Sequence, residues 1–110
     1  MNYVAMEKES EIVNFPGAMS WQLFTHETSP IPGFYAMINE FTNEEYLTPG
    51  IHADHEGFYV VEGAGNIRIG DVEYQLEAGT AMIVPAGTKH AIKRNGKGTL
   101  KIFLYHFPLS

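Results

Sequence analysis

Short runs of β-branched and aromatic residues alternate along this chain with glycine, proline and other turn-forming residues. The runs have the length of strands, and none shows the apolar spacing of three and four residues that marks an amphipathic helix. Many short strands separated by turn signals predict an all-β sandwich or barrel in a single domain. The predicted strands are residues 34–41, 58–62, 66–69, 73–76, 81–84, 90–93 and 100–107.

Two of the breaks between these runs have the composition of tight turns. Gly70-Asp71 separates two alternating segments, as in a two-residue β-hairpin. Residues 95–98 read Asn-Gly-Lys-Gly and precede the last predicted strand. We therefore expect a tight hairpin at the first position and a second turn at residues 95–98.

Two of the runs are apolar at consecutive positions rather than at alternate ones. Residues 58–61 read Phe-Tyr-Val-Val, and residues 100–107 carry apolar side chains on both parities. A strand of this kind has both faces covered. One face would meet the barrel interior and the other a further layer or a second subunit, so we expect a homodimer.

The first thirty residues differ from the rest of the chain. Their apolar pattern is weak over the first fifteen positions, and Trp21 and Phe24 are followed by a stretch that contains Pro30 and Pro32. We interpret residues 1–30 as an arm or edge segment packed on a barrel formed by residues 31–110.

The amino-acid composition excludes several classes of protein and of binding partner. A length of 110 residues with 45% hydrophobic and 18% charged residues fits one globular domain. The absence of cysteine excludes disulfides, thiolate metal sites and a cysteine nucleophile. A net charge of −6 argues against a nucleic-acid partner. No apolar run approaches the ~20 residues of a membrane helix and no signal segment is evident, so we expect a cytoplasmic protein without a membrane partner.

Two of the five histidines stand in surroundings that suggest a metal site. His52 lies four residues before Glu56, and His90 follows a turn at residues 85–87. Imidazole nitrogens and carboxylate oxygens are ordinary ligands of Zn, Fe, Mn, Ni and Cu. Two histidines and one carboxylate on one face leave coordination positions open for a substrate or for oxygen. A carboxylate inside an apolar barrel would need a cation, a proton or strong hydrogen bonds.

The spacing around Glu56 resembles the first motif of the cupin superfamily, the small barrels of the RmlC-like type. That motif is G(X)5HXH(X)3–4E(X)6G, and His52, Glu56 and Gly63 match its second histidine, its glutamate and its final glycine. The chain departs from the motif at two places. Gly50 stands where the first histidine belongs, and Glu44 stands where the opening glycine belongs.

The segment around His90 resembles the second motif of the same superfamily, G(X)5PXG(X)2H(X)3N. Gly79, Pro85, Gly87 and His90 match this motif without a gap, and Arg94 takes the place of its asparagine. The resemblance covers residues 35–107. It implies an antiparallel double-stranded β-helix, the jelly-roll barrel of the cupins.

The resemblance also implies a ligand set of His52, Glu56 and His90 inside the barrel. The cofactor would be a divalent metal ion, Fe, Mn, Ni, Zn or Cu. Because Gly50 removes one of the four usual ligands, two interpretations stay open. The chain has either a metal site with an extra open position or a barrel that has given up its metal.

Four further residues are candidates for contacts with a substrate. His55 is a substitute ligand or a rim histidine, because adjacent strand residues face opposite sides. Phe58 shares the inward strand face of the glutamate. Arg94 either pairs with an acidic substrate or is a solvated strand end, and Tyr46 either lines the cavity or supplies an acid. We interpret His106, which lies in an apolar terminal strand, as a packed or interface histidine.

Two classes of function are consistent with these residues, and both involve a small-molecule ligand. In the first, the metal acts on a small oxygenated molecule, as in the dioxygenases, isomerases and lyases that share the fold. In the second, the barrel binds a sugar or organic acid without metal, as in the ligand-binding domains of AraC-type regulators. The histidine missing at position 50 favours the second class, and no residue is singled out as catalytic.

Overall fold

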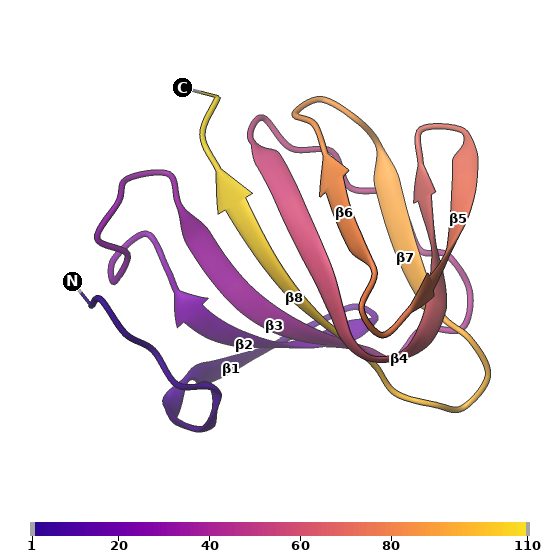
Figure 1. Cartoon of the computed structure of the whole chain (residues 1–110), viewed down its shortest axis with the longest axis horizontal. Helices are drawn as coiled ribbons and strands as arrows, with labels where there is room; N and C mark the ends of the chain where they lie inside the picture. The colour runs from indigo at the N-terminus through magenta and orange to yellow at the C-terminus, as the bar shows by residue number, and fades with distance from the viewer. Residues whose placement is uncertain (1, 110) are drawn as a thin grey trace.

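The computed structural model of the protein describes residues 2–109 and is built almost entirely from β-strands (Figure 1). The pattern of short strands had predicted an all-β fold, and this is confirmed. Within the described range, no helix is long and apolar enough to span a bilayer. The elements are the 3-10 turn η1 (Glu7–Glu9) and the strands β1 (Glu11–Phe15), β2 (Ala18–Phe24), β3 (Tyr35–Phe41), β4 (His55–Ile69), β5 (Val72–Glu77), β6 (Ala81–Val84), β7 (His90–Arg94) and β8 (Leu100–Phe107).

The strands form an antiparallel jelly-roll barrel whose two walls share strand β4. Neighbouring strands follow the order β1-β2-β3-β8-β4-β5. The first part of β4 pairs with β8 and β6, and its second part pairs with β5 and β7. In Figure 1, β4 curves from one wall of the barrel into the other. Because side chains on alternate positions of β4 face the interior, this strand supplies residues to the whole barrel.

Strand β4 corrects one prediction, because residues 58–62 and 66–69 belong to a single strand. Gly63 and Gly65 lie between them, and the strand passes through both glycines as it bends. Gly63 has a φ of +93°, and a Cβ atom there would overlap the carbonyl oxygen of Thr99. A Cβ at Gly65 would overlap a carbonyl oxygen of β7. The close approach of neighbouring backbones therefore requires glycine at both positions.

The barrel interior is filled by alternate residues of the strands. Val60, Ile67, Leu100 and Ile102 are fully buried and form the centre of the apolar core. On β8 the even-numbered residues from Leu100 onward face inward, and the residues between them are less buried. This alternation places the last even-numbered residue of β8 on the interior face as well.

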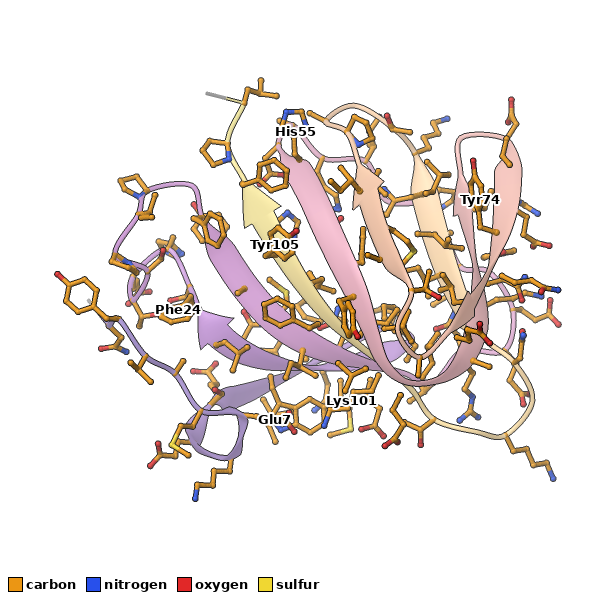
Figure 2. All side chains as sticks on the ribbon, viewed as in Figure 1. Glu7, Phe24, His55, Tyr74, Lys101 and Tyr105 are labelled. Carbon is orange, nitrogen blue, oxygen red and sulfur yellow. The ribbon has the colours of Figure 1, made fainter. Side chains whose placement is uncertain are left out.

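The predicted turns are confirmed, and the N-terminal segment is joined to the barrel sheet. β4 ends at Ile69 and β5 begins at Val72, so Gly70 and Asp71 form the two-residue hairpin. Residues 95–99 connect β7 to β8. The first thirty residues supply η1, β1 and β2, and β2 pairs with β3. An ion pair of 3.0 Å between Lys101 and Glu7 ties η1 to the barrel (Figure 2).

The outer face of β4 is not covered within a single chain. Residues 58–61 were expected to have this face covered by a further layer or a second subunit, and in one chain Tyr59 is 48% exposed and Val61 is 46% exposed. Ile83 on the neighbouring strand β6 is 63% exposed. The single chain therefore covers the inner face of this region and leaves the outer face in contact with solvent.

Candidate metal centre

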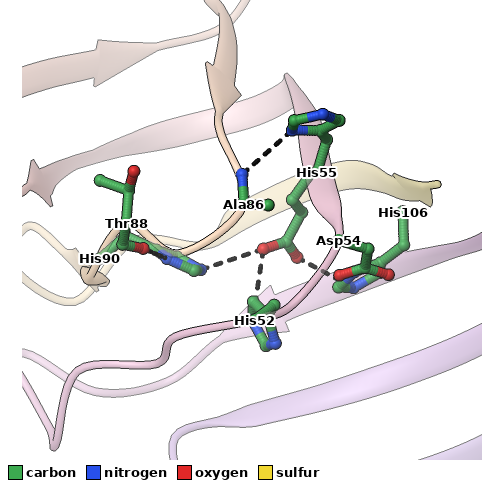
Figure 3. A network of polar contacts seen from close by, with 8 residues as sticks. His52, Asp54, His55, Ala86, Thr88, His90 and His106 are labelled. Carbon is green, nitrogen blue, oxygen red and sulfur yellow. Dashed lines mark hydrogen bonds and ion pairs between the residues drawn. The ribbon is translucent and has the colours of Figure 1, made fainter. Parts of the chain in front are cut away.

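Glu56 is a buried carboxylate near the start of β4. Glu56 is 5% exposed, and it shares the inward face of the strand with Phe58 and Val60, which are also buried. A carboxylate in such surroundings costs free energy unless other groups compensate for its charge. The compensating groups are three histidines that converge on it (Figure 3).

His52 and His90, the two histidines predicted from their spacing, lie on one side of Glu56. Nε2 of His90 is 3.0 Å from Oε1 of Glu56, and Nε2 of His52 is 3.5 Å from the same oxygen. His90 opens β7 and is buried, whereas the His52 side chain lies in the segment before β4 and is 40% exposed. One ligand atom from each of the three residues lies within 4.8 Å of the others. The structure therefore brings the three predicted ligands together.

The geometry around Glu56 fits a bound cation. Oε1 of Glu56 is buried and has no hydrogen-bond partner with suitable geometry, although two imidazoles approach it. A buried carboxylate oxygen without such a partner is costly, and a cation between the three ligand atoms would satisfy it. The donor set of two imidazoles and one carboxylate suits several first-row metals.

The ring of His90 is held in an orientation that serves this site. Its Nδ1 lies 3.1 Å from the backbone carbonyl oxygen of Thr88, so Nδ1–H donates to that oxygen and Nε2 faces Glu56. Metal-binding histidines usually have their second ring nitrogen fixed in this way. Two backbone hydrogen bonds between Gly50 and His90 hold the start of β7 against the segment that carries His52.

Position 50 faces the site although glycine offers no ligand there. A Cβ atom at Gly50 would lie 3.5 Å from Nε2 of His52 and 3.9 Å from Cε1 of His90. A side chain at this position would therefore be in van der Waals contact with both imidazoles. The backbone at this position needs no left-handed φ, so glycine is not required by the local conformation.

His106 belongs to the same cluster, and the interpretation of this residue as a packed or interface histidine was wrong. Its Nε2 lies 3.1 Å from Oε2 of Glu56, and its Nδ1 lies 3.3 Å from Oδ1 of Asp54. Glu56 and His106 are direct partners in the pairing of β4 with β8. The signal in the sequence was the alternation on β8, because His106 shares the parity of the buried residues Leu100 and Ile102.

The charges of the cluster shift the pKa values of its members. Burial by itself raises the pKa of Glu56, but contacts with His106 and His90 outweigh burial and lower it to about 2. Burial lowers the pKa of His90, and the contacts with Glu56 and with the Thr88 carbonyl raise it above its usual value. The pKa of His106 is likewise raised, because Glu56 and Asp54 outweigh burial.

We predict that the stability of the metal-free protein is greatest in weakly acidic solution. The lowered pKa of Glu56 contributes stability above pH 4.5, which is lost as the pH falls toward about 2. The raised pKa values of His90 and His106 contribute stability below pH 6.5, which is lost as the pH rises through the raised values. These pKa shifts all arise from the same interaction between Glu56 and the histidines. Its contribution to the free energy of unfolding is on the order of 3 kcal/mol. Thermal unfolding of chelator-treated protein at a series of pH values measures it.

The Glu56→Gln variant is the control for this profile, since it removes the carboxylate that the histidines contact. We expect the stability maximum between pH 4.5 and 6.5 to become flatter in the variant. A native profile that keeps rising through neutral pH would contradict the prediction, and so would an identical profile in the variant.

Two of the predicted substrate contacts, His55 and Phe58, lie beside the cluster. His55 accepts a hydrogen bond of 3.0 Å at Nδ1 from the backbone N–H of Ala86, and its ring packs against Phe107 (Figure 3). Phe58 is buried in the core and meets the His90 ring edge-on, with 6.1 Å between the ring centroids.

The other two predicted contacts lie farther from Glu56. Arg94 is at the opposite end of β7 from His90 and donates a 3.3 Å hydrogen bond to the carbonyl of Gly98. The Tyr46 hydroxyl donates to Glu73 at 2.6 Å. Burial and this contact raise the pKa of Tyr46 to about 12. Tyr46 lines a cavity of about 400 Å³ whose lining also includes His90.

A pocket leads from the surface to the cluster and offers a path for a ligand. It has a volume of about 370 Å³, and His52, Asp54 and His106 line its inner end. Its walls come from β2 and β3 and combine apolar groups with an amide and a phenol. These wall residues are Gln22, Phe24, Tyr35 and Met37, and Thr25 and His26, which follow β2, also line the pocket. None of the four predicted substrate contacts lines this pocket.

Comparison with known protein families agrees with the motifs. A family model described as "Cupin domain" matches residues 41–106, which is more than half of the chain. This chain belongs to the cupin family. The match contains the three residues of the proposed ligand set and His106 at its last position. No curated protein matched this cupin.

Solved structures share the fold of this cupin at low sequence identity. The plu4264 protein of Photorhabdus luminescens has a TM-score of 0.81 and 20% identity, covering 99% of this chain and 90% of that one. An RmlC-like cupin of Shewanella frigidimarina has a TM-score of 0.80 and 20% identity, covering 98% and 92%. Fe(II)-HppE, solved with the alternative substrate (S)-1-HPP, has a TM-score of 0.83 and 22% identity. That alignment covers 96% of this chain and 60% of the longer one. These likenesses establish the jelly-roll fold.

Proposed function

We propose that this cupin binds a divalent first-row metal ion through His52, Glu56 and His90 and uses it to act on or bind a small oxygenated molecule. The observation that carries the proposal is the convergence of the three ligand atoms on a buried Oε1 of Glu56 that has no hydrogen-bond partner. Without a cation, this oxygen has only the ion-pair contacts with His90 and His52 to offset its burial. The donor set supports Fe, Mn, Ni, Zn or Cu as the cofactor.

The residues of the site have separate roles in this proposal. The Thr88 carbonyl fixes His90 with Nε2 toward Glu56, and the partly exposed His52 lies at the inner end of the pocket. When bound, the metal would supply Lewis acidity toward an oxygen atom of the ligand. Gln22 and Tyr35 on the pocket walls could orient polar groups of that ligand, while Phe24 and Met37 exclude water from it. That Fe(II)-HppE shares the fold supports a redox-active metal as one candidate.

Elemental analysis of protein purified without a histidine tag or chelator tests the proposal. We expect close to one metal ion per chain, either as isolated or after incubation with Fe, Mn, Ni, Zn or Cu. Absence of binding for all five metals would overturn the proposal. The alternative of a metal-free sugar or organic-acid binding barrel would then be screened with those ligands.

We also propose that this cupin forms a homodimer through the outer face of β8, β4 and β6. Phe103, Tyr105 and Phe107 form an aromatic row along β8, with centroid distances of 5.8 and 5.9 Å between successive rings. Tyr59 pairs directly with Phe103, and the exposed Ile83 lies on the same face one strand away. Exposed apolar patches of this kind mark interaction surfaces.

Light scattering at micromolar concentration tests the dimer. We expect a mass of twice the 12.3 kDa of one chain. The Ile83→Lys variant is expected to give a monomer, because it places a charge in the apolar interface. As a matched control, Val72→Lys changes an exposed residue of strand β5, on the other wall of the barrel, and should leave the mass unchanged. A monomeric native protein would contradict the proposal.

A further inference from the structure

We propose that His106 is a fourth ligand of the metal ion, supplied by β8 to the site that His52, Glu56 and His90 form. The inference rests on the proposed metal-binding function and makes its ligand set specific. Nε2 of His106 lies 3.1 Å from Oε2 of Glu56, and the His106 side chain is only 14% exposed.

The orientation of the His106 ring is that of a metal ligand. Its Nδ1 lies 3.3 Å from Oδ1 of Asp54, so the carboxylate holds the ring with Nε2 directed at the cluster. A carboxylate on one ring nitrogen and a metal on the other is a recurring arrangement of metal-binding histidines. His90 has the equivalent arrangement, with the carbonyl of Thr88 in place of the carboxylate. The two histidines thus present the same ring atom to opposite oxygens of Glu56.

The placement of His106 compensates for the glycine at position 50. The ring of His52 lies between the other two imidazoles, with centroid distances of 5.1 Å to His90 and 5.2 Å to His106. Gly50 faces His52 and His90 but contributes no ligand atom. With His106 included, the site has three imidazoles and one carboxylate.

The pairing of β4 with β8 makes this placement a fixed property of the fold. Glu56 and His106 are opposite each other in the antiparallel register. Directly opposed residues have their Cβ atoms about 5 Å apart on the same face of the sheet. The register therefore places His106 on the inward face beside Glu56, with its Nε2 at the second carboxylate oxygen.

Long-range 1H–15N NMR of the labelled protein, titrated with Zn2+, tests the proposal without an activity assay. We expect the Nε2 signals of His52, His90 and His106 to change together and to saturate at one equivalent of Zn2+. His26 and His55, which lie outside the cluster, are internal controls and should not change. Changes at His52 and His90 alone would overturn the role of His106 and leave the proposed function intact. No change at any of the three, together with no binding of Fe, Mn, Ni or Cu in the elemental analysis, would overturn the proposed function itself.

Two variants separate a ligand from a residue that only orients Glu56. His106→Gln keeps a side-chain donor that can reach Glu56 but removes the imidazole. We expect it to reduce the number of Zn2+-bound imidazoles from three to two and to weaken Zn2+ binding by about 100-fold. Asp54→Asn should keep three bound imidazoles and weaken binding by roughly 10–100-fold, as expected for a partner that orients a ligand. An affinity of His106→Gln within about threefold of the native value, measured by chelator competition, would overturn the proposal.

Discussion

Replacing Glu56 with glutamine is expected to lower the metal affinity of this cupin by at least about 100-fold. Changes to groups that only orient metal ligands already cost 10–100-fold, and a direct ligand contributes more. The glutamine is close in size to glutamate, but it lacks the negative charge that balances the cation inside the apolar barrel. Chelator competition and elemental analysis after dialysis measure the effect.

His90→Ala is expected to cause a similar loss, because it removes the most closely placed imidazole, whose Nε2 is 3.0 Å from Glu56. Both variants have matched controls within the chain. Glu62→Gln makes the same chemical change at an exposed position of β4, and His26→Ala removes a histidine that is 75% exposed. The controls should retain full metal content. If Glu56→Gln or His90→Ala also retained it, the metal site would have to lie elsewhere.

The second large effect is expected at Gly63, where alanine should lower the free energy of unfolding by about 3 kcal/mol or more. The added Cβ would overlap the carbonyl oxygen of Thr99, and φ at this position is +93°. The neighbouring backbone cannot move aside easily, because Gly63 is paired with Leu100, a fully buried core residue. Urea unfolding, with the midpoint and the slope reported separately, measures the loss.

Gly79→Ala is the matched control, since it separates the conformational cost from the collision. Gly79 has nearly the same φ of +92°, but no atom lies within 4 Å of the position that its Cβ would take. We expect this variant to lose only about 1 kcal/mol, the cost of the left-handed conformation. Equal losses in the two variants would contradict the close approach of β4 and the β7–β8 connection.

Much of the fold and part of the site could be predicted because their signals are local. The alternation of strand-length runs and turns indicated an all-β barrel, and the tight turn at residues 70–71 was predicted from its composition. His52 and Glu56 are four residues apart, and His90 follows a recognisable turn. These features depend on neighbours in sequence and on the fixed side-chain period of a strand, so the chain encodes them directly.

The role of His106 and the crowding at the glycines of β4 depend on partners that are distant in sequence. The role of His106 comes from the register of β8 against β4, which brings it opposite a glutamate fifty residues away. The glycines at 63 and 65 are typical of a turn when considered alone, and only the crossing backbones of neighbouring strands explain them. The outer face of β4 was expected to be covered by a further layer or a second subunit, and a single chain leaves it half exposed.

The sequence by itself determined the class of fold, the jelly-roll motifs and three residues suited to a metal ion. Strand period, turn chemistry and ligand type are properties of short segments, so they can be inferred without coordinates. Only the tertiary structure decided which side chains meet around Glu56, and that the site includes a histidine from the last strand. The physical reason is that strand register is set by the packing of the whole barrel, because a shift of one residue would turn His106 away from the interior.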